Sequence, residues 1–478
     1  MANIIGCQAE SFPFRYLGLT VGANMNRVAN WRPVYNIIDA RLAKWKATML
    51  SMGGRITLIK SVLESLPNYF FSLYKAPVQV IKDIESKIRN FLWGGDNESK
   101  KIHWAAWDRV AGPIDKGGLG LSKLNHINIS LLIKWGWRFK SEKENLWVRV
   151  IEAVHKSNSN LDSFPIRKSL GGVWFNIVNL LDNVLLDNKP IKDLFKGELG
   201  NGESIKFWLD SWLPGGPLKH RFPSLFELET KKECRVIERI NNSGNSRFSW
   251  KWRRVITAGQ EVDDLIGLCS LLFNVSLIDV PDKWVWDGSA DRLFSVSSIK
   301  ASLSNKFNPQ WNYVPSLCKW LPRKYNVFIW RLGVNKLATM DALKSRNIDR
   351  GDQTCVLCGE CDETAEHLFS SCSFSSTVWA LISLWCKIPC IWAFSVKDLL
   401  ESHEFAGISG RKKDIIQGVI RIGCWVIWKS RNEARFNNKP VKMEEVIREI
   451  KSFGFFWFNA RSKDIEINWL DWCNFVNM

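Results

Sequence analysis

The hydrophobic positions near the start of the chain recur with a helical period. From residue 31 to residue 49 they are spaced three or four apart, which places one set on a single helix face: Trp31, Val34, Ile38, Leu42, Trp45 and Met49. Gly53 and Gly54 interrupt the pattern, and a second set with the same spacing ends before Pro67: Ile56, Ile59, Leu63 and Leu66. The pattern predicts a helical hairpin.

Strand-like patterns are confined to the middle of the chain. Around 200–213, GNGESIKFWLDSW predicts a short strand after an Asn-Gly turn. At 283–303, KWVWDGSADRLFSVSSIKASL predicts a strand, an Asp-Gly turn, a second strand and then a helix. From residue 320 onward the pattern is helical again. We therefore expect an α+β protein that is mostly helical.

Glycines at 117, 118 and 120 lie before a helix-like run and invite comparison with phosphate-binding loops. No Lys-Ser/Thr pair follows them, and their spacing is not that of a dinucleotide-binding fingerprint. We interpret them as turn residues.

The composition is that of a folded protein with an excess of positive charge. Of 478 residues, 46% are hydrophobic and 24% charged, and the formal net charge is +18. Residues 1–160 hold 23 Lys and Arg against 12 Asp and Glu, so this third of the chain carries most of the excess. Such a surplus attracts polyanions. The basic residues of the predicted hairpin could form either a solvated face or a phosphate-contacting surface: Arg41, Lys44, Lys46, Arg55 and Lys60.

The N-terminal residues lack the basic and apolar segments of a secretory signal, and no apolar run approaches the ~18–20 residues needed to cross a bilayer. We expect a protein of the nucleus or cytoplasm that is neither secreted nor bound to a membrane. In such a reducing compartment, the twelve cysteines should be thiols or metal ligands rather than disulfides.

The stretch CVLCGECDETAEHLFSSC at 355–372 has the spacing of a zinc knuckle. Cys355 and Cys358 form a Cys-x2-Cys pair that Gly359 follows, and His367 and Cys372 complete a set of four. Cys361 repeats the Cys-x2-Cys spacing and is the alternative ligand if His367 is free. Because protein side chains fill all four positions in either set, we expect a structural Zn2+ rather than a catalytic one.

Several stretches together resemble the C-terminal part of reverse transcriptases from plant non-LTR (LINE-like) retroelements. The order of the motifs carries the resemblance, which covers nearly the whole chain: FPFRYLGLTVG (12–22), LAKWKATMLSMGGRITLIKSVLESLPNYF (42–70), FLWGG (91–95), GGLGL (117–121), KWGWRF (134–139), FWLDSW (207–212), WVWDGSADRLFSV (284–296), PRKYNVFIWRL (322–332), the cysteine stretch itself and WKSRNEARF (428–436).

The resemblance implies a multi-domain order. It places a helical thumb-like region at 1–75, a basic helical connection at 76–160 and a mixed α/β connecting region at 161–292. A small reverse-transcriptase zinc-binding domain would follow at 293–385, with a helical tail at 386–478.

The resemblance also implies RNA-directed DNA synthesis, but the residues that perform it are not found here. The family's palm aspartates, which hold Mg2+, lie in a Tyr/Phe-Ala-Asp-Asp motif upstream of the FPFRYLG stretch. The pair Asp263 and Asp264 lacks that context and is read as a surface acidic pair. We therefore expect Met1 to lie inside a longer ancestral frame, with no catalytic residue in this chain. No endonuclease or ribonuclease H series is recognised.

Three hypotheses follow for the function. The first is a truncated retroelement polymerase that grips RNA or DNA template-primer through phosphates, and its expected contacts are Lys44, Lys46, Arg55, Lys60, Lys134 and Arg138. The second is a zinc-dependent nucleic-acid-binding protein that acts alone or beside an intact polymerase. The third is a retroelement relic without a selected role.

Overall fold

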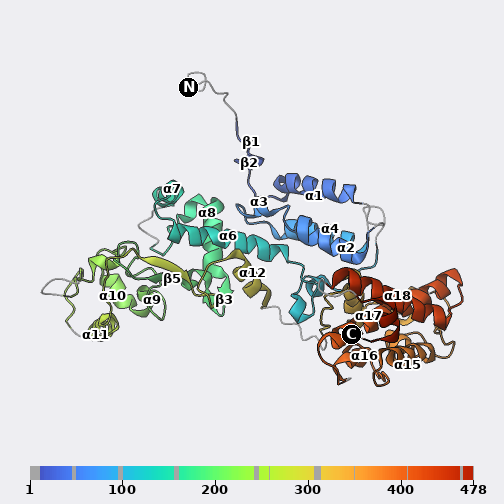
Figure 1. Cartoon of the computed structure of the whole chain (residues 1–478). Coiled ribbons are helices and arrows are strands. Elements are labelled where there is room, and N and C mark those ends of the chain that lie inside the picture. Colours follow the sequence, from blue (N-terminus) through green and yellow to red (C-terminus); the bar gives the residue numbers. More distant parts are fainter. Residues whose placement is uncertain are drawn as a thin grey trace. The chain divides into compact units, whose positions relative to one another are not determined.

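Helices make up most of the chain, and the described residues contain three small antiparallel sheets of two strands each (Figure 1). The expected α+β, mostly helical fold is confirmed. This computed structural model describes residues 11–45, 50–94, 101–155, 161–241, 247–257, 259–305, 314–348, 350–405, 407–462, 467–476 and 478. None of the helices within these ranges has the length and apolar content that crossing a membrane requires.

The chain divides into two compact units, each made from separate stretches of sequence. Unit 1 comprises Met1–Asp39, Glu64–Glu85 and Lys123–Phe307, and unit 2 comprises Ala40–Leu63, Ser86–Ser122 and Asn308–Met478. Helices α1 (Arg32–Lys44) and α4 (Val78–Trp93) contribute residues to both.

Unit 1 begins with the hairpin of β1 (Phe14–Tyr16) and β2 (Leu19–Val21). Its other elements are α3 (Asn68–Phe71), α6 (Leu124–Ser141), α7 (Leu146–His155), α8 (Gly172–Asn183), β3 (Leu185–Leu186), β4 (Lys189–Pro190), β5 (Phe195–Glu198), α9 (Leu218–Arg221), α10 (Pro223–Leu228), α11 (Gln260–Leu272), β6 (Lys283–Trp286) and α12 (Val296–Asn305).

One core of unit 1 forms where α6 packs against α8 and α12. The close approach of α6 and α8 requires a glycine, because a Cβ at Gly136 would lie 2.6 Å from a methyl of Leu181. Strands β5 and β6 pair beside this core, with Phe195 opposite Trp286. The tryptophans here serve packing, as expected for large rigid side chains in a core.

The strand predicted around 200–213 is not formed, so that prediction is wrong. A distant carboxylate holds the segment in turns instead: Asp282 accepts the backbone N–H groups of Gly200 and Gly202 at 2.8 and 2.9 Å and that of Ser204 at 2.8 Å. Since these backbone donors already have a side-chain partner, no neighbouring strand is needed to satisfy them.

The hairpin predicted at 283–295 is half right. Strand β6 forms as expected and α12 follows, but β6 pairs with β5, and after the Asp-Gly turn the chain accepts the N–H of Trp286 at Arg292 (3.0 Å) without forming a second strand. Arg292 adopts a left-handed backbone conformation (φ 57°), and the Asp291 carboxylate accepts the backbone N–H of Leu293 at 3.0 Å. This local turn uses the backbone that a second strand would need.

Unit 2 is helical. Its elements are α2 (Met52–Leu58), a π-helical turn (Ile59–Leu63), α5 (Trp107–Val110), α13 (Arg323–Gly333), α14 (Met340–Lys344), a second π-helical turn (His367–Ser371), α15 (Ser373–Cys386), α16 (Val396–Phe405), α17 (Gly410–Asn437), α18 (Met443–Arg461) and α19 (Trp469–Asn474). The long helix α17 packs against α13, α16 and α18, and its buried face forms the centre of one large core (Figure 1).

The predicted helices near the start and the predicted glycine turn are both present. Helix α1 covers Val34, Ile38 and Leu42 of the first periodic segment, and α2 with the π-helical turn that follows it covers the second segment as far as Leu63. Residues 46–49 lie outside the described residues. The glycine loop closes on itself, because the N–H of Gly118 donates to Pro113 and that of Gly120 donates to Gly112. These backbone donors are used within the loop and do not form a phosphate cradle.

Candidate metal centre and basic residues

Cys355 and Cys358 lie in a tight turn at residues 355–361 within unit 2, which we call the knuckle. The turn is closed by two backbone hydrogen bonds: Cys355 N–H donates to Cys361 at 2.7 Å, and Gly359 N–H donates to Cys355 at 2.8 Å. Gly359 has a left-handed backbone (φ 72°), which explains why a glycine follows the second cysteine. The turn therefore presents two sulfur atoms on one side.

His367 and Cys372 come from the other side of the centre. His367 begins the second π-helical turn, and its backbone N–H donates to the Thr364 hydroxyl at 2.9 Å. Cys372 ends that turn and precedes α15, and its N–H donates to the His367 carbonyl at 2.8 Å. One turn of helix thus sets the spacing between these two side chains.

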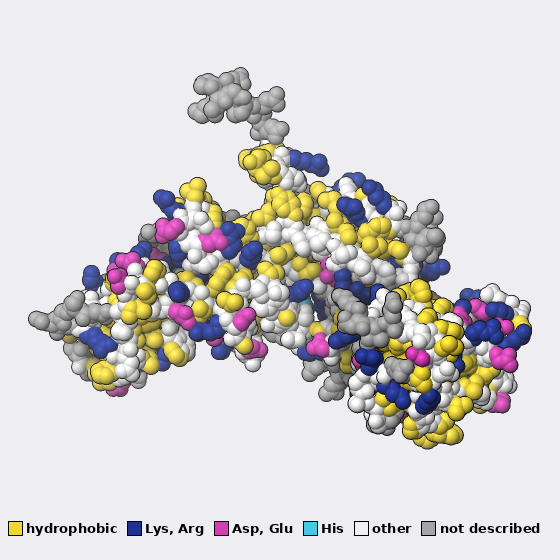
Figure 2. Space-filling view, in the orientation of Figure 1, with side chains coloured by type: hydrophobic (Ala, Val, Ile, Leu, Met, Phe, Trp, Pro, Cys, Tyr) yellow, Lys and Arg dark blue, Asp and Glu magenta, His cyan; other side chains and the backbone are white. Residues whose placement is uncertain are grey.

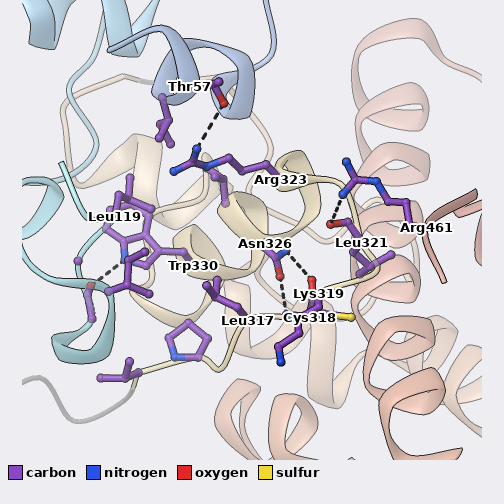
Figure 3. A pocket seen from close by; sticks show the side chains of 17 residues that line it. Thr57, Leu119, Leu317, Cys318, Lys319, Leu321, Arg323, Asn326, Trp330 and Arg461 are labelled. Carbon is purple, nitrogen blue, oxygen red and sulfur yellow. Dashed lines mark hydrogen bonds between the residues drawn. The ribbon is translucent and has the colours of Figure 1, made fainter. Parts of the chain in front are cut away.

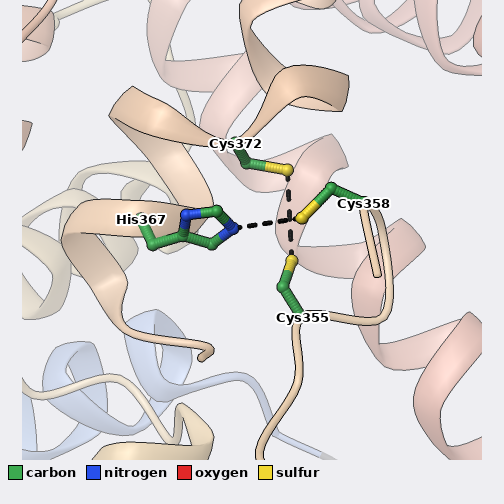
Figure 4. Close-up of side chains that lie close together, drawn as sticks. All are labelled: Cys355, Cys358, His367 and Cys372. Carbon is green, nitrogen blue, oxygen red and sulfur yellow. Dashed lines mark hydrogen bonds between the residues drawn. The ribbon is translucent and has the colours of Figure 1, made fainter. Parts of the chain in front are cut away.

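The four side chains converge on one point (Figure 4). One ligand atom of each residue lies within 4.8 Å of the others, with 4.0 Å between the sulfurs of Cys355 and Cys372. The sulfur of Cys358 lies 3.3 Å from Nε2 of His367. Tetrahedral zinc bound by three sulfurs and one nitrogen would separate two sulfurs by about 3.8 Å and a sulfur from the nitrogen by about 3.6 Å. The residues fit a zinc ion.

Cys361 lies outside this cluster. Its side chain is exposed, and it contributes to the knuckle through its carbonyl oxygen. Of the two ligand sets left open by the sequence, the structure brings together the one with His367. The hydrogen bond between the sulfurs of Cys355 and Cys372 raises the pKa of Cys355 and lowers that of Cys372.

A buried carboxylate fixes the knuckle to α17. Glu363 accepts Nε of Arg431 at 2.8 Å and a second hydrogen bond from Nη2 of the same guanidinium, and both side chains are almost fully buried. Arg435, one turn further along α17, donates to the carbonyls of Asp352 and Thr354. The two arginines thus bind residues that precede and follow the knuckle in the sequence. Helix α17 therefore supports the metal centre.

Comparison with known proteins identifies this region. Residues 294–379 match the family described as zinc-binding in reverse transcriptase. Residues 294–379 are therefore a reverse-transcriptase-related zinc-binding region. All four converging side chains lie within the match, and the resemblance to the C-terminal part of a reverse transcriptase is confirmed.

Two curated relatives extend the similarity beyond the zinc-binding domain. A candidate ribonuclease H protein of Arabidopsis thaliana is 26% identical over 351 residues, which is 72% of this chain and 54% of that protein. An uncharacterised mitochondrial protein of the same plant is 26% identical over 153 residues, which is 31% of this chain and 93% of that protein. The chain thus spans about half the length of the first relative.

The matched zinc-binding domain does not coincide with one compact unit. Its first residues belong to unit 1, where Phe294, Ile299 and Leu303 join the α6 core. Its cysteines and histidine belong to unit 2, in the core around α17. The metal centre is therefore built on helices that follow the matched domain as well as on the domain itself.

The basic residues proposed from the sequence for unit 2 differ in exposure. Lys44 is exposed at the end of α1, whereas Lys46 lies outside the described residues. Arg55 and Lys60 are half-buried. Burial lowers the pKa of Arg55, whose guanidinium donates to the carbonyl of Leu92 at 3.5 Å. Of the three that the structure describes, Lys44 is the exposed one.

The two residues proposed for unit 1 lie on α6. Lys134 is exposed. Arg138 forms two hydrogen bonds with Glu142, at 2.7 and 2.8 Å, and this pairing raises the pKa of Arg138. Its guanidinium also lies 4.7 Å from the ring centre of Trp135. Arg138 is engaged within its own helix, so Lys134 is the more available cation. Figure 2 shows basic and acidic side chains interspersed over the visible surface.

The acidic pair has the surface setting expected of it. Asp263 and Asp264 lie in the first half of α11, where Asp263 is exposed and Asp264 accepts a hydrogen bond from Gln260 at 3.0 Å. The cluster of Cys355, Cys358, His367 and Cys372 is the one convergent group of metal-binding side chains within the described ranges, and the aspartate pair does not belong to it.

Proposed function

We propose that this chain is the nucleic-acid-binding C-terminal part of a plant non-LTR retroelement reverse transcriptase, clasped by a structural zinc ion at Cys355, Cys358, His367 and Cys372. The observation that carries the proposal is the convergence of these four side chains inside the matched zinc-binding domain. When bound, zinc would cross-link the knuckle to α15 and perform no catalysis. The proposal thus has three parts: the four zinc ligands, the origin in a non-LTR retroelement, and a chain without the catalytic aspartates of the polymerase.

The positive charge supports RNA and DNA as partners. The net charge of +18 favours a polyanion, and Lys44 and Lys134 are exposed cations. Contacts of this kind are independent of sequence and hold a template-primer duplex by its phosphates.

A test of nucleic-acid binding is its dependence on salt. With about four to six phosphate contacts, affinity for a template-primer duplex should fall about 10²- to 10³-fold between 50 and 200 mM salt. Lys44→Gln and Lys134→Gln should each reduce the slope of log affinity against log salt by about one. Fluorescence anisotropy with a labelled RNA–DNA duplex measures both quantities. An affinity that does not change with salt would contradict the proposal.

A second candidate function is a stand-alone or accessory zinc-dependent nucleic-acid-binding protein. It is favoured by one observation: the described metal centre and the core that supports it both lie within unit 2. The two candidates differ in what the chain does with an added polymerase. Stimulation of primer extension by an intact retroelement polymerase would favour the accessory role.

A further inference from the structure

Unit 2 contains a cavity away from the metal centre. It measures about 460 Å³ and lies between α2, the glycine turn at 114–119, the segment at 314–321 and α13 (Figure 3). Its outer edge is formed by Val314 and Leu317, which are 37% and 54% exposed. The cavity therefore opens to solvent along the segment at 314–321.

Most of the side chains that line this cavity are apolar, and hydrogen bonds hold some of the lining residues in place. Ile56, Leu119 and Trp330 are buried side chains that line it. Nε1 of Trp330 donates to the carbonyl of Gly117 at 2.8 Å, which fixes the indole ring. The amide of Asn326 both donates to and accepts from the backbone of Cys318, at 2.9 and 3.0 Å. A planar apolar group could enter without rearranging these walls.

A second cavity of about 510 Å³ continues from the first. The two share four lining residues: Leu317, Cys318, Lys319 and Arg461. The second is bordered by α17 and α18 through Arg411, Gln417 and Phe458. Because the two cavities share these residues, we treat them as one groove beside the segment at 314–321.

The charge of this groove is strongly positive. Four cations line it, namely Lys319, Arg323, Arg411 and Arg461, against one carboxylate, Asp414. Within the described part of the chain none of the four is in an ion pair, in contrast to Arg138 and Arg431. Arg323 donates to the Thr57 hydroxyl and Arg461 to the Leu321 carbonyl, both at 3.3 Å (Figure 3). Their positive charge is available to an anionic ligand.

We propose that this groove binds a single-stranded stretch of RNA or DNA, with one base in the apolar cavity and the flanking phosphates at the four cations. The proposal rests on the proposed function and adds a site to it. Bases of a single strand can leave the stack and enter an apolar slot, whereas a duplex keeps its bases paired. The four cations of the groove favour a ligand with several phosphates over an uncharged apolar ligand.

The test uses the full chain and labelled 20-nucleotide oligouridine RNA, oligothymidine DNA and a blunt duplex. Arg461→Gln should weaken single-strand binding about fivefold, and Leu317→Asp about tenfold, with duplex binding within twofold of wild type. Matched controls are Arg448→Gln on the same helix and Leu384→Asp, which is also at an exposed leucine of unit 2. Both should stay within twofold for every ligand. Zinc content and thermal unfolding report whether each variant is folded.

A single 2-aminopurine in the RNA reports insertion of a base. Its fluorescence should change on binding wild type and Arg448→Gln but not on binding Leu317→Asp. Equal weakening of duplex and single strand by the groove variants, or no weakening of either, would overturn the site. If the protein binds duplex but not single strands, the groove site is wrong and the proposed function remains supported. If it binds neither, the proposed function is wrong. Tight binding of uridine monophosphate or of a fatty acid at the groove would assign it to another ligand.

Discussion

His367→Ala should release zinc from the protein and unfold the knuckle around Cys355. The imidazole provides one of four converging ligand atoms, and its Nε2 lies 3.3 Å from the sulfur of Cys358. Structural zinc in small domains contributes about 10–16 kcal/mol of apparent binding free energy at neutral pH, which is large compared with the other contacts that hold the turn at Cys355. Metal content after gel filtration measures the loss, and Cys358→Ala should behave in the same way.

The matched control is Cys361→Ala, which removes a thiol three residues from Cys358. Its sulfur is exposed and lies outside the cluster, and the carbonyl that closes the knuckle is retained in the variant. This variant should keep about one zinc ion per chain, as expected for a four-ligand site. A Cys361 variant that loses the metal while the His367 variant keeps it would overturn the ligand assignment.

Arg431→Ala should destabilise the zinc-binding region by about 3–5 kcal/mol, because it removes both guanidinium hydrogen bonds to a buried carboxylate and leaves only Arg435, at 3.8 Å, as an ion-pair partner. The side chains of Glu363 and Arg431 are 0% and 1% exposed. The same carboxylate also accepts the backbone N–H of Met340 at 3.1 Å, which connects α14 to the knuckle. Urea unfolding followed by release of zinc to a coloured chelator measures the stability of this region specifically.

An exposed ion pair of the same region provides the comparison. Nζ of Lys439 lies 3.0 Å from a carboxylate oxygen of Glu433, and the two side chains are 56% and 30% exposed. Lys439→Ala should lower the free energy of unfolding by less than about 1 kcal/mol. The double variant Glu363→Leu with Arg431→Met should recover much of the stability, since it removes both buried charges. If Arg431→Ala lowered the free energy of unfolding no more than Lys439→Ala, the contact of α17 with Glu363 would not stabilise the zinc-binding region.

The metal centre could be predicted because its geometry is local. Four ligands within eighteen residues can meet through one turn and one helix start, and the spacing alone indicates that they do. The sequence could not decide between His367 and Cys361, because that depends on the direction in which each side chain points. Direction is set by the backbone hydrogen bonds of the knuckle.

Interactions between distant residues are what the sequence did not reveal. Glu363 looks like a surface residue in an acidic loop, and only the fold places it against Arg431, 68 residues away. The failed strand around 200–213 has a similar cause, since Asp282 lies about 80 residues from the turns that it holds. The charge count likewise gave no sign that Arg138 is paired with Glu142 whereas Lys134 is exposed.

The most direct test of the central claim is the zinc content and zinc-edge X-ray absorption spectrum of the full chain purified without added metal. The structure predicts about one zinc ion per chain, with three sulfur neighbours at about 2.3 Å and one nitrogen neighbour at about 2.0–2.1 Å. A spectrum with four sulfur neighbours and no nitrogen would show that Cys361, and not His367, is the fourth ligand. A chain that purifies folded and without zinc would contradict the zinc clasp on which the proposed function depends.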